Sequence, residues 1–411
     1  MKNMCWCHAS SPRFSALFAT VAPLDASVCM SCGYTIYRTF EICEWAIGRL
    51  PASLSKLPPL LSLSDILLRN WTMNKFDPTK DIPDLTGKVA IVTGGNRGMG
   101  FHVVQQLVNH GAKVYMAARS EVSALEAIAK IEAAKPEIKS KNQINYLHLD
   151  LGTLKSAQAS ATEFLGLETE LDILVHNGGL MNHPYAKTSD GLEDGMAINH
   201  FAPFVFTKLL SPLLIKSAEK QGTDVRVIMV SSEIHSRAPP GGKFASLDEI
   251  NDPLAPPSSQ DGLVARYARY ARTKLANILY AKQLQKVFDE ASSTALAIAV
   301  NPGGVATDTV LEDMGSFRLV GPILRFLVSK FAKSPLEGSL SALYVATSPD
   351  VRRSASKFAG AYVEPVGKLF APSKDAQNDE LAKVLWEVTE KVAGEILDSQ
   401  VADIEHSPLY T

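Results

Sequence analysis

Short apolar runs alternate with longer segments of helical periodicity between residues 88 and 300. The runs are apolar at nearly every position, which is typical of parallel strands buried on both faces. They predict strands at 89–92, 113–117, 145–149, 172–175, 225–230 and 295–300. The segments between them predict helices at 101–110, 121–134, 156–165, 197–215 and 267–288. This alternation predicts an α/β fold, a doubly wound parallel sheet of the Rossmann type in three αβα layers, with its chemistry at the carboxyl ends of the strands.

The first predicted strand leads into a glycine-rich turn, Thr93 to Gly100 (TGGNRGMG), which opens the first helix. The unpaired N–H groups and the positive dipole end of a helix at such a turn can hold a pyrophosphate. Gly94 and Gly98 allow a tight turn close to a ligand, and Gly100 allows the helix to pack close to the strand. Glycines at this spacing also open ordinary turns, so the motif alone leaves the ligand undecided.

Tyr270 and Lys274 lie four residues apart, on one side of the helix predicted at 267–288. A neighbouring ammonium group stabilises a phenolate and lowers the phenol pKa from about 10 towards a range useful for acid–base chemistry. Ser232, at the end of a predicted strand, can hydrogen-bond a substrate carbonyl or hydroxyl. Asn199 can hold a water that links the lysine to solvent. A surface Tyr/Lys pair is the alternative interpretation.

Together these motifs resemble the short-chain dehydrogenase/reductase family, over roughly residues 84–372. The resemblance implies hydride transfer between a nicotinamide cofactor and a carbonyl or alcohol, with Tyr270 as the acid/base and Ser232 polarising the oxygen. Lys274 would also hold the nicotinamide ribose, and Asn199 would complete the proton relay. No metal ligand is expected. The implied cofactor contacts are Thr93, Gly94, Asn96, Arg97, Gly98, Met99, Gly100, Arg119, Asp150, Leu151, Asn177, Gly178, Tyr270, Lys274, Pro302, Gly303, Val305 and Thr307.

Two segments depart from the family pattern. The family's NNAG segment is represented by His176-Asn177-Gly178-Gly179, in which we interpret His176 as a hydrogen-bonded structural residue rather than a second acid/base. A proline- and glycine-rich insertion at 237–262, between the serine and the tyrosine, predicts either a lid over the site or a surface excursion. His235 is predicted to be a packing or surface residue.

Two arginines favour NADP(H) over NAD(H) as the cofactor. Arg119 stands at the end of the second strand, where NAD enzymes of this fold usually carry an acidic residue, and Arg97 lies in the glycine turn. Guanidinium groups can grip a 2′-phosphate that an acidic side chain would repel. Because most cells keep the NADP pool reduced, we expect reduction of a ketone or aldehyde, with alcohol oxidation as the reverse. A catalytically silent nucleotide-binding scaffold is the alternative function.

The substrate is expected to be an apolar small molecule. Residues 308–333 carry many large apolar side chains with Arg and Lys between them, and predict an apolar lid, an amphipathic helix on a membrane surface, or a helix packed on the body. The segments 270–277 (YARTKLAN) and 362–372 (YVEPVGKLFAP) most resemble the retinol-dehydrogenase-like and WW-domain-oxidoreductase-like branch, without a WW domain. That branch implies an apolar carbonyl compound or alcohol.

Residues 1–72 differ from the rest and contain all five cysteines of the chain. Their spacing repeats no known zinc-finger pattern. We favour a poorly ordered extension, with a signal-peptide core or a mitochondrial leader as alternatives, and Met73 as a place where the body could begin. The dehydrogenase domain is expected at 84–372, followed by a C-terminal helix and tail at 373–411. The helix at 379–397 is either a closing or a subunit-contact element, which leaves a homodimer open.

The overall charge and hydropathy add limits on partners. A net charge of −2 gives no reason to expect nucleic-acid binding. No uncharged apolar run reaches the roughly 18 residues of a membrane span, although peripheral membrane contact stays open. The absence of cysteine after residue 43 suits a reducing compartment, so we expect a cytoplasmic protein, with import directed by residues 1–72 as the alternative.

Overall fold

The computed structural model describes residues 76–220, 222–305 and 333–405. All of them belong to the second of the two units of the chain, Leu61–Thr411. The predicted extension at 1–72, the predicted cofactor contact Thr307 and nearly all of the segment 308–333 lie outside the described residues.

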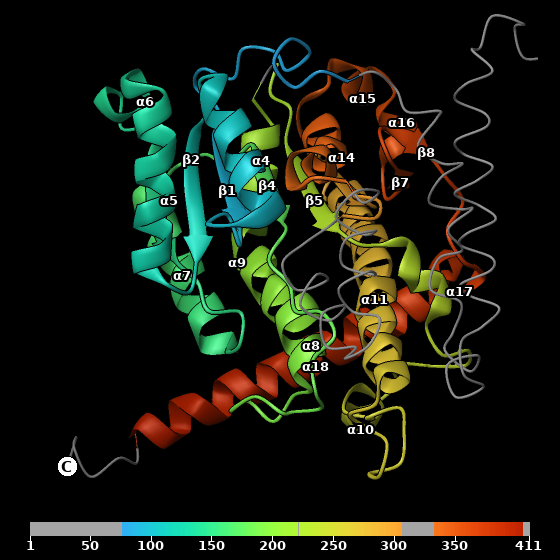
Figure 1. The fold of residues 1–411 in the computed structure, drawn as a ribbon. Helices are drawn as coiled ribbons and strands as arrows, with labels where there is room; N and C mark the ends of the chain where they lie inside the picture. Colours follow the sequence, from blue (N-terminus) through green and yellow to red (C-terminus); the bar gives the residue numbers. More distant parts are fainter. Residues whose placement is uncertain (1–75, 221, 306–332, 406–411) are drawn as a thin grey trace, which may run out of the picture. The chain divides into compact units, whose positions relative to one another are not determined.

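The described residues form an eight-stranded sheet in the order β3-β2-β1-β4-β5-β6-β7-β8. Strands from β3 to β7 run parallel, and β8 pairs antiparallel with β7 at the edge (Figure 1). The strand order reverses between β1 and β4, the point at which doubly wound sheets bind ligands. The fold prediction is therefore confirmed. The strands are β1 (Val89–Thr93), β2 (Lys113–Ala118), β3 (Ile144–His148), β4 (Ile173–His176), β5 (Arg226–Val230), β6 (Leu296–Val300), β7 (Tyr362–Glu364) and β8 (Lys368–Leu369).

Helices cover both faces of the sheet and give the three layers (Figure 1). One apolar layer joins the strands to α4, α5 and α14, and the other joins them to α7, α9, α11 and α18. The helices are α4 (Gly98–Asn109), α5 (Glu121–Ala134), α6 (Pro136–Ser140), α7 (Leu154–Leu167), α8 (Asp194–Met196), the π-helical turn η1 (Ala197–Phe201), α9 (Ala202–Ala218), the 3₁₀ turn η2 (Glu233–Arg237), α10 (Leu247–Ile250), α11 (Leu263–Glu290), α14 (Pro335–Thr347), α15 (Pro349–Arg353), α16 (Ala355–Phe358), α17 (Lys374–Gln377) and α18 (Asp379–Glu405).

Alternate residues of each central strand enter different apolar layers. In β1, Ile91 packs on the α9 and α11 side, whereas Ala90 and Val92 pack on the α4 and α14 side. All three side chains are fully buried. Burial on both faces explains why these strands are apolar at every position, and why the six predicted strands agree with β1 to β6 within one residue at each end.

The long C-terminal helix α18 packs across α9 and α11. The Trp386 ring stacks on the Tyr280 ring of α11, with centroids 5.7 Å apart, and meets the Phe204 ring of α9 edge-on at 4.9 Å. The Thr389 hydroxyl donates its hydrogen to the Leu385 carbonyl. It therefore acts as the acceptor in its 2.8 Å hydrogen bond with His200 Nε2. The helix predicted at 379–397 therefore packs on the body of its own chain, and its role as a closing or a subunit-contact element stays a prediction.

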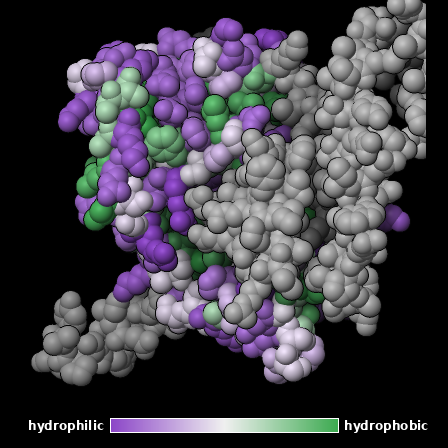
Figure 2. Space-filling model, in the orientation of Figure 1, coloured by the Kyte–Doolittle hydropathy of each residue, from purple (hydrophilic) through white to green (hydrophobic). Residues whose placement is uncertain are grey.

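Within the described ranges, one helical stretch, Asp194–Ala218, has the length and hydropathy of a membrane span. In this fold 67% of its most apolar window is buried, and it forms the core helix on one face of the sheet. The visible surface of the described part is mostly hydrophilic, with apolar residues in small separate groups (Figure 2). Two exposed apolar residues, Val122 and Leu125, lie on α5.

Candidate active site

The glycine turn between β1 and α4 leaves the amino end of α4 open to an anion. Gly94 and Gly98 have φ values of +63° and +56°, in the left-handed region that glycine adopts at low cost. Among the described residues no side chain caps α4, and its first turn contains no acidic residue. By contrast, α5 and α7 are capped by Ser120 and Thr153. The uncapped N–H groups and the helix dipole fit a dinucleotide pyrophosphate.

Gly100 is required by the turn itself. A Cβ at this position would lie 2.3 Å from the Gly94 carbonyl oxygen and 2.5 Å from Asn177 Nδ2. The sequence predicts that Gly100 allows close packing of the helix on the strand. The contact that excludes a side chain is instead with the turn and with the loop after β4.

Thr93 and Asn177 brace the glycine turn against the end of β4. Thr93 Oγ1 accepts the N–H groups of Asn177 and Gly178 at 3.1 and 2.9 Å, and Asn177 Nδ2 donates to the Thr93 carbonyl at 3.0 Å. The Thr93 side chain is fully buried, and its hydroxyl oxygen is the acceptor in two of these bonds.

Gly178 stands where the family pattern has alanine, and a Cβ there would lie 3.0 Å from a methyl carbon of Leu151.

His176 is a structural residue in the geometry observed. Its Nε2 lies 2.6 Å from the Thr207 hydroxyl, and the side chain is buried between β4 and α9. Burial lowers the pKa of His176 to about 3, so the ring is neutral at physiological pH. The interpretation made from the sequence agrees with this bonding.

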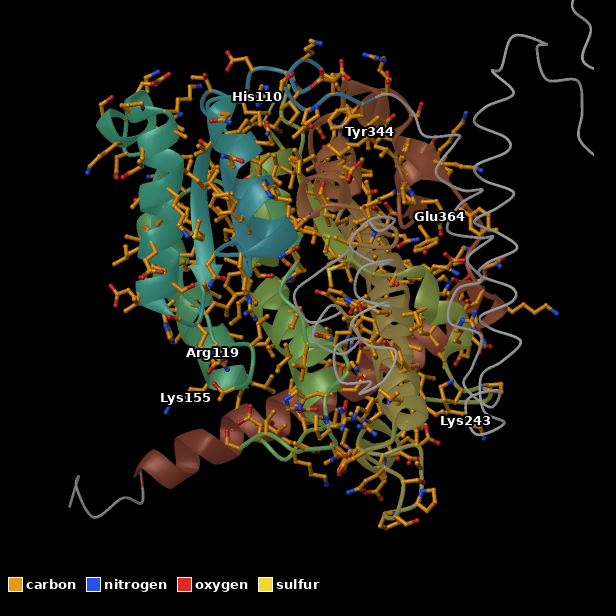
Figure 3. All side chains as sticks on the ribbon, in the orientation of Figure 1. His110, Arg119, Lys155, Lys243, Tyr344 and Glu364 are labelled. Atoms are coloured by element: carbon orange, nitrogen blue, oxygen red, sulfur yellow. The ribbon has the colours of Figure 1, made fainter. Side chains whose placement is uncertain are left out.

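The predicted adenosine contacts occupy the edge of the sheet near β2 and β3. Arg97 and Arg119 are exposed, and Arg119 directly follows β2, beyond the arrowhead of that strand (Figure 3). Asn96 Nδ2 donates to Ser123 Oγ at 2.8 Å and ties the glycine turn to α5. Asp150 Oδ1 accepts the Gly152 N–H at 2.9 Å, which fixes the carboxylate just after β3.

Three predicted cofactor residues, Met99, Asn177 and Pro302, lie together where α4 and α14 meet the ends of β4, β5 and β6. Val230 and Gly338 lie beside them. These residues come from α4, from α14 and from the ends of β4, β5 and β6, so the fold brings together segments that are far apart in the sequence.

Lys274 is buried beneath the tyrosine on the inner side of α11. Its Nζ donates to the Val230 carbonyl at 2.8 Å and lies 5.4 Å from the centre of the Tyr270 ring. Burial lowers the pKa of Lys274 to about 8. The spacing of four residues therefore brings the two side chains together, as predicted.

The pKa of Tyr270 moves in the direction opposite to the one predicted. Burial raises the pKa of its phenol above the usual value, and the neighbouring Tyr267 adds to the rise. The cause is desolvation, which disfavours the phenolate more than the lysine at this distance favours it. The protonated form of Tyr270 is thus the stable one at neutral pH.

Asn199 lies in the π-helical turn η1, at 2% exposure. Its Oδ1 accepts the Leu180 N–H at 2.7 Å, and its Nδ2 donates to the Leu180 carbonyl and to Thr273 Oγ1, both at 2.9 Å. Both amide hydrogens are therefore engaged, so the predicted contact with a water is left to the second lone pair of Oδ1. A Cβ on Gly179 would lie 3.0 Å from Asn199 Oδ1 and 3.8 Å from Lys274 Nζ, which puts both groups beside the loop after β4.

Ser232 follows β5 and begins the turn η2, where its Oγ accepts the Ile234 N–H at 3.3 Å. The preceding Ser231 is buried, and its hydroxyl donates to the Lys274 carbonyl at 2.7 Å. The first serine therefore joins β5 to α11, and the second is partly exposed.

His235 is a buried packing residue, whose Nδ1 donates to the Ser232 carbonyl at 2.8 Å while Nε2 accepts the Ser373 N–H at 3.1 Å.

The insertion at 237–262 is fastened to the start of α11 by two buried arginines that sequence analysis missed. Arg269 donates to the carbonyls of Pro253 and Gln260 at 2.9 and 2.8 Å, and Arg272 donates to that of Glu249 at 2.9 Å. Glu193 lies 3.6 and 3.7 Å from the two guanidinium groups, and all three side chains are buried. The two arginines flank Tyr270 in a part of α11 whose other side chains are mostly buried. That position is the sequence signal that could have identified them.

Gly303 has φ +83° in the loop after β6, and its N–H donates to Asn301 Oδ1 at 2.9 Å. Val305 pairs with Lys333 through an isolated parallel bridge, and the Lys333 N–H donates to the Gly304 carbonyl at 2.9 Å. The predicted contacts Pro302, Gly303 and Val305 thus belong to a loop whose two ends are joined.

A doubly wound sheet with an open helix end and a tyrosine–lysine pair along one edge belongs to the class of dinucleotide-dependent oxidoreductases. Residues 88–243 match the family model described as short chain dehydrogenase. The chain belongs to the short-chain dehydrogenase/reductase family and is an NAD(P)-dependent oxidoreductase.

The chain is similar to several fungal members. It is 38% identical to the short chain dehydrogenase/reductase dpchH of Colletotrichum higginsianum, over 93% of this chain and 92% of that protein. That coverage means that the similarity begins before residue 76. A short-chain dehydrogenase/reductase of Armillaria gallica is also 38% identical, over 75% of this chain and 93% of its own length.

More distant proteins share the fold. The WW domain-containing oxidoreductase of Pongo abelii is 32% identical, over 77% of this chain and 70% of that protein. The crystal structure of a putative uncharacterized protein from Mycobacterium paratuberculosis superposes with a TM-score of 0.56 at 24% identity, covering 79% of this chain and 98% of that one.

Proposed function

We propose that this protein is an NADPH-dependent reductase of ketones or aldehydes on apolar small molecules, with alcohol oxidation as the reverse reaction. The observation that carries the proposal is the pairing of the half-buried Tyr270 with the buried Lys274, which is joined to β5 next to Ser232. A protein that only bound nucleotides would have no use for an ammonium group held in an apolar interior, where burial lowers its pKa.

The nicotinamide, when bound, supplies the hydride to the carbonyl carbon or takes it up from the alcohol. Tyr270 gives the proton of its phenol to the carbonyl oxygen, and its raised pKa keeps that proton in place until the oxygen becomes basic. Ser232 donates its hydroxyl hydrogen to the same oxygen and orients it. The Lys274 ammonium offsets the charge that develops on the phenolate.

We assign the cofactor preference to the exposed guanidinium groups of Arg97 and Arg119. Arg119 directly follows β2. The first acidic side chain after β2 is Glu121, in the first turn of α5. A 2′-phosphate at this edge of the sheet would meet two positively charged side chains. The described residues 113–120 contain no carboxylate that could accept hydrogen bonds from the ribose hydroxyls of NAD.

The substrate class rests on the resemblance of 270–277 and 362–372 to the retinol-dehydrogenase-like and WW-domain-oxidoreductase-like branch. The similarity to the WW domain-containing oxidoreductase of Pongo abelii supports this branch. We therefore propose apolar carbonyl compounds and alcohols as substrates.

The test is NADPH consumption with a panel of apolar ketones and aldehydes, comparing the parent with Tyr270→Phe. We expect the rate to fall at least ~100-fold, because the proton donor is lost while the ring remains. Tyr267→Phe, one turn away on the same helix, is the matched control and should keep most of the rate. Equal rates for the parent and Tyr270→Phe would refute the proposed role and favour the scaffold interpretation.

A further inference from the structure

The amide of Asn301 connects the loop after β6 to a buried carboxylate. Its Oδ1 accepts the Gly303 N–H at 2.9 Å, and its Nδ2 donates to Glu364 Oε2 at 3.0 Å. Glu364 ends β7, the strand next to β6, and its other oxygen accepts the Tyr362 hydroxyl at 3.0 Å. Asn301 and Glu364 are buried, at 2% and 7% exposure (Figure 3 labels Glu364).

Glu364 determines which way the Asn301 amide faces. A carboxylate can only accept hydrogen bonds, so the NH₂ group of the asparagine must point to it. The amide oxygen is then left for the Gly303 N–H, in a glycine at φ +83°. Without the carboxylate, the Asn301 amide would lose one of the two partners that hold its orientation, and its bond to the Gly303 N–H would be held less firmly.

Titratable groups face Glu364 from the elements around it. Lys333 lies against the loop, with Nζ 2.8 Å from where a Cβ of Gly303 would stand. His235 packs its ring against the Tyr362 ring, with centroids 4.9 Å apart. Burial lowers the pKa of Lys333 and of His235, and the Glu364 charge counteracts part of this effect in both.

We propose that Glu364 is a positioning residue for the nicotinamide end of the cofactor, acting through the Asn301 amide on the loop Pro302–Gly303. The inference rests on the proposed assignment of Pro302 and Gly303 as cofactor contacts. Glu364 touches neither substrate nor cofactor in this role. Glu364 fixes the orientation of the Asn301 amide, and the amide oxygen holds the Gly303 N–H. The loop Pro302–Gly303 is thereby held in one conformation next to the nicotinamide.

The test changes donors and acceptors without changing size. In Asn301→Asp the new carboxylate still accepts the Gly303 N–H but has no hydrogen to give Glu364. We expect NADPH to bind roughly tenfold more weakly at pH 8, measured as Kd from the fluorescence of the bound dihydronicotinamide without substrate. As the pH falls towards 6, one of the two facing carboxylates takes up a proton, the bond re-forms and the Kd returns towards that of the parent.

The double variant Asn301→Asp/Glu364→Gln reverses the direction of the hydrogen bond. The introduced glutamine amide donates to the introduced aspartate carboxylate and still accepts the Tyr362 hydroxyl, so the bonds of the network are restored. We expect its Kd for NADPH to lie within about twofold of the parent at pH 8. Because this variant restores the network, it also gives a result if the single variant does not fold.

The matched control is Asn378→Asp, the same substitution at an exposed position where the side-chain oxygen accepts the N–H groups of Glu380 and Leu381. It should bind NADPH as the parent does. A Kd for Asn301→Asp equal to that of the parent, a weakening that is the same at all pH values, or no rescue in the double variant would overturn the inference. The proposed function fails separately, if Tyr270→Phe keeps its turnover, whatever the Kd values are.

Discussion

Lys274 Nζ donates to the backbone carbonyl of Val230 at 2.8 Å. Val230 is the last residue of β5, two positions before Ser232, and Asn277 Nδ2 donates to the same carbonyl at 3.1 Å. The Ser231 hydroxyl returns a bond to the Lys274 carbonyl. The helix that carries the tyrosine and the strand that carries the serine are therefore one rigid frame, and the lysine is part of that frame.

Replacing this lysine by methionine should stabilise the cofactor-free protein while it abolishes turnover. Burial lowers the pKa of Lys274 from 10.5 to about 8, so the unfolded chain binds more protons between these values and parent stability rises with pH across that window. Lys274→Met removes the free-energy cost of burying the charged ammonium group, about 3 kcal/mol, which is fully present below pH 8. Urea unfolding at pH 7 and pH 10 measures it, with the exposed Lys141→Met as control. A stability difference that is independent of pH would contradict the prediction.

Arg119→Asp should reverse the cofactor preference. The substitution removes a guanidinium partner of the 2′-phosphate and adds a carboxylate that repels it, so the ratio of kcat/KM for NADPH to that for NADH should fall about 100-fold. Steady-state kinetics with both cofactors measures the ratio. Lys357→Asp makes a similar charge reversal on α16 and should leave the ratio unchanged. If Arg119→Asp also leaves it unchanged, the arginine does not select the cofactor.

Thr207→Val should cost stability and spare catalysis. It removes the partner of His176 Nε2 at a fully buried position, which leaves a polar ring atom unsatisfied at a cost of about 1–3 kcal/mol. Denaturant unfolding measures the loss, and kcat should stay within about twofold of the parent. A large loss of kcat with unchanged stability would mean that His176 has a chemical role.

Glu193→Gln should loosen the insertion at 237–262. It removes the carboxylate that faces Arg269 and Arg272 and leaves two buried guanidinium groups without their nearest negative charge, for a loss of about 3 kcal/mol. Trypsin should then cleave faster after Arg237 and Lys243. Asp248→Asn changes an exposed carboxylate in the same insertion and serves as the control. Cleavage at the parental rate would show that the arginines do not hold the insertion in place.

The central part of the fold could be predicted because burial on both faces leaves a strong mark on the sequence. β1, β2, β4, β5 and β6 are almost entirely apolar, whereas β3 (INYLH), at the edge of the sheet, is partly exposed; all six agree with their predicted bounds within one residue at each end. β7 and β8 are three and two residues long, too short to produce a periodic signal, and they went unpredicted. The helix expected at 197–215 is preceded by α8 and opens as the π-helical turn η1, which contains Asn199 and which no apolar periodicity marks.

The site was predictable in its residue types and less so in its electrostatics. The spacing of Tyr270 and Lys274 gave their proximity, since four residues on a helix share a face. The raised pKa of Tyr270 depends on desolvation by the whole fold, which no local pattern records. Asn301 and Glu364 are 63 residues apart in the sequence, and only the pairing of β6 with β7 brings them together.

The packing of α18 gives this enzyme a built-in optical reporter. Trp386 is the only tryptophan after residue 71, and its ring is stacked on Tyr280 of the helix that also carries Tyr270 and Lys274. Its emission, obtained as the difference between the parent and Trp386→Phe, responds to separation of α18 from α11. Detachment of the C-terminal helix can therefore be followed in solution apart from global unfolding, without attaching a dye.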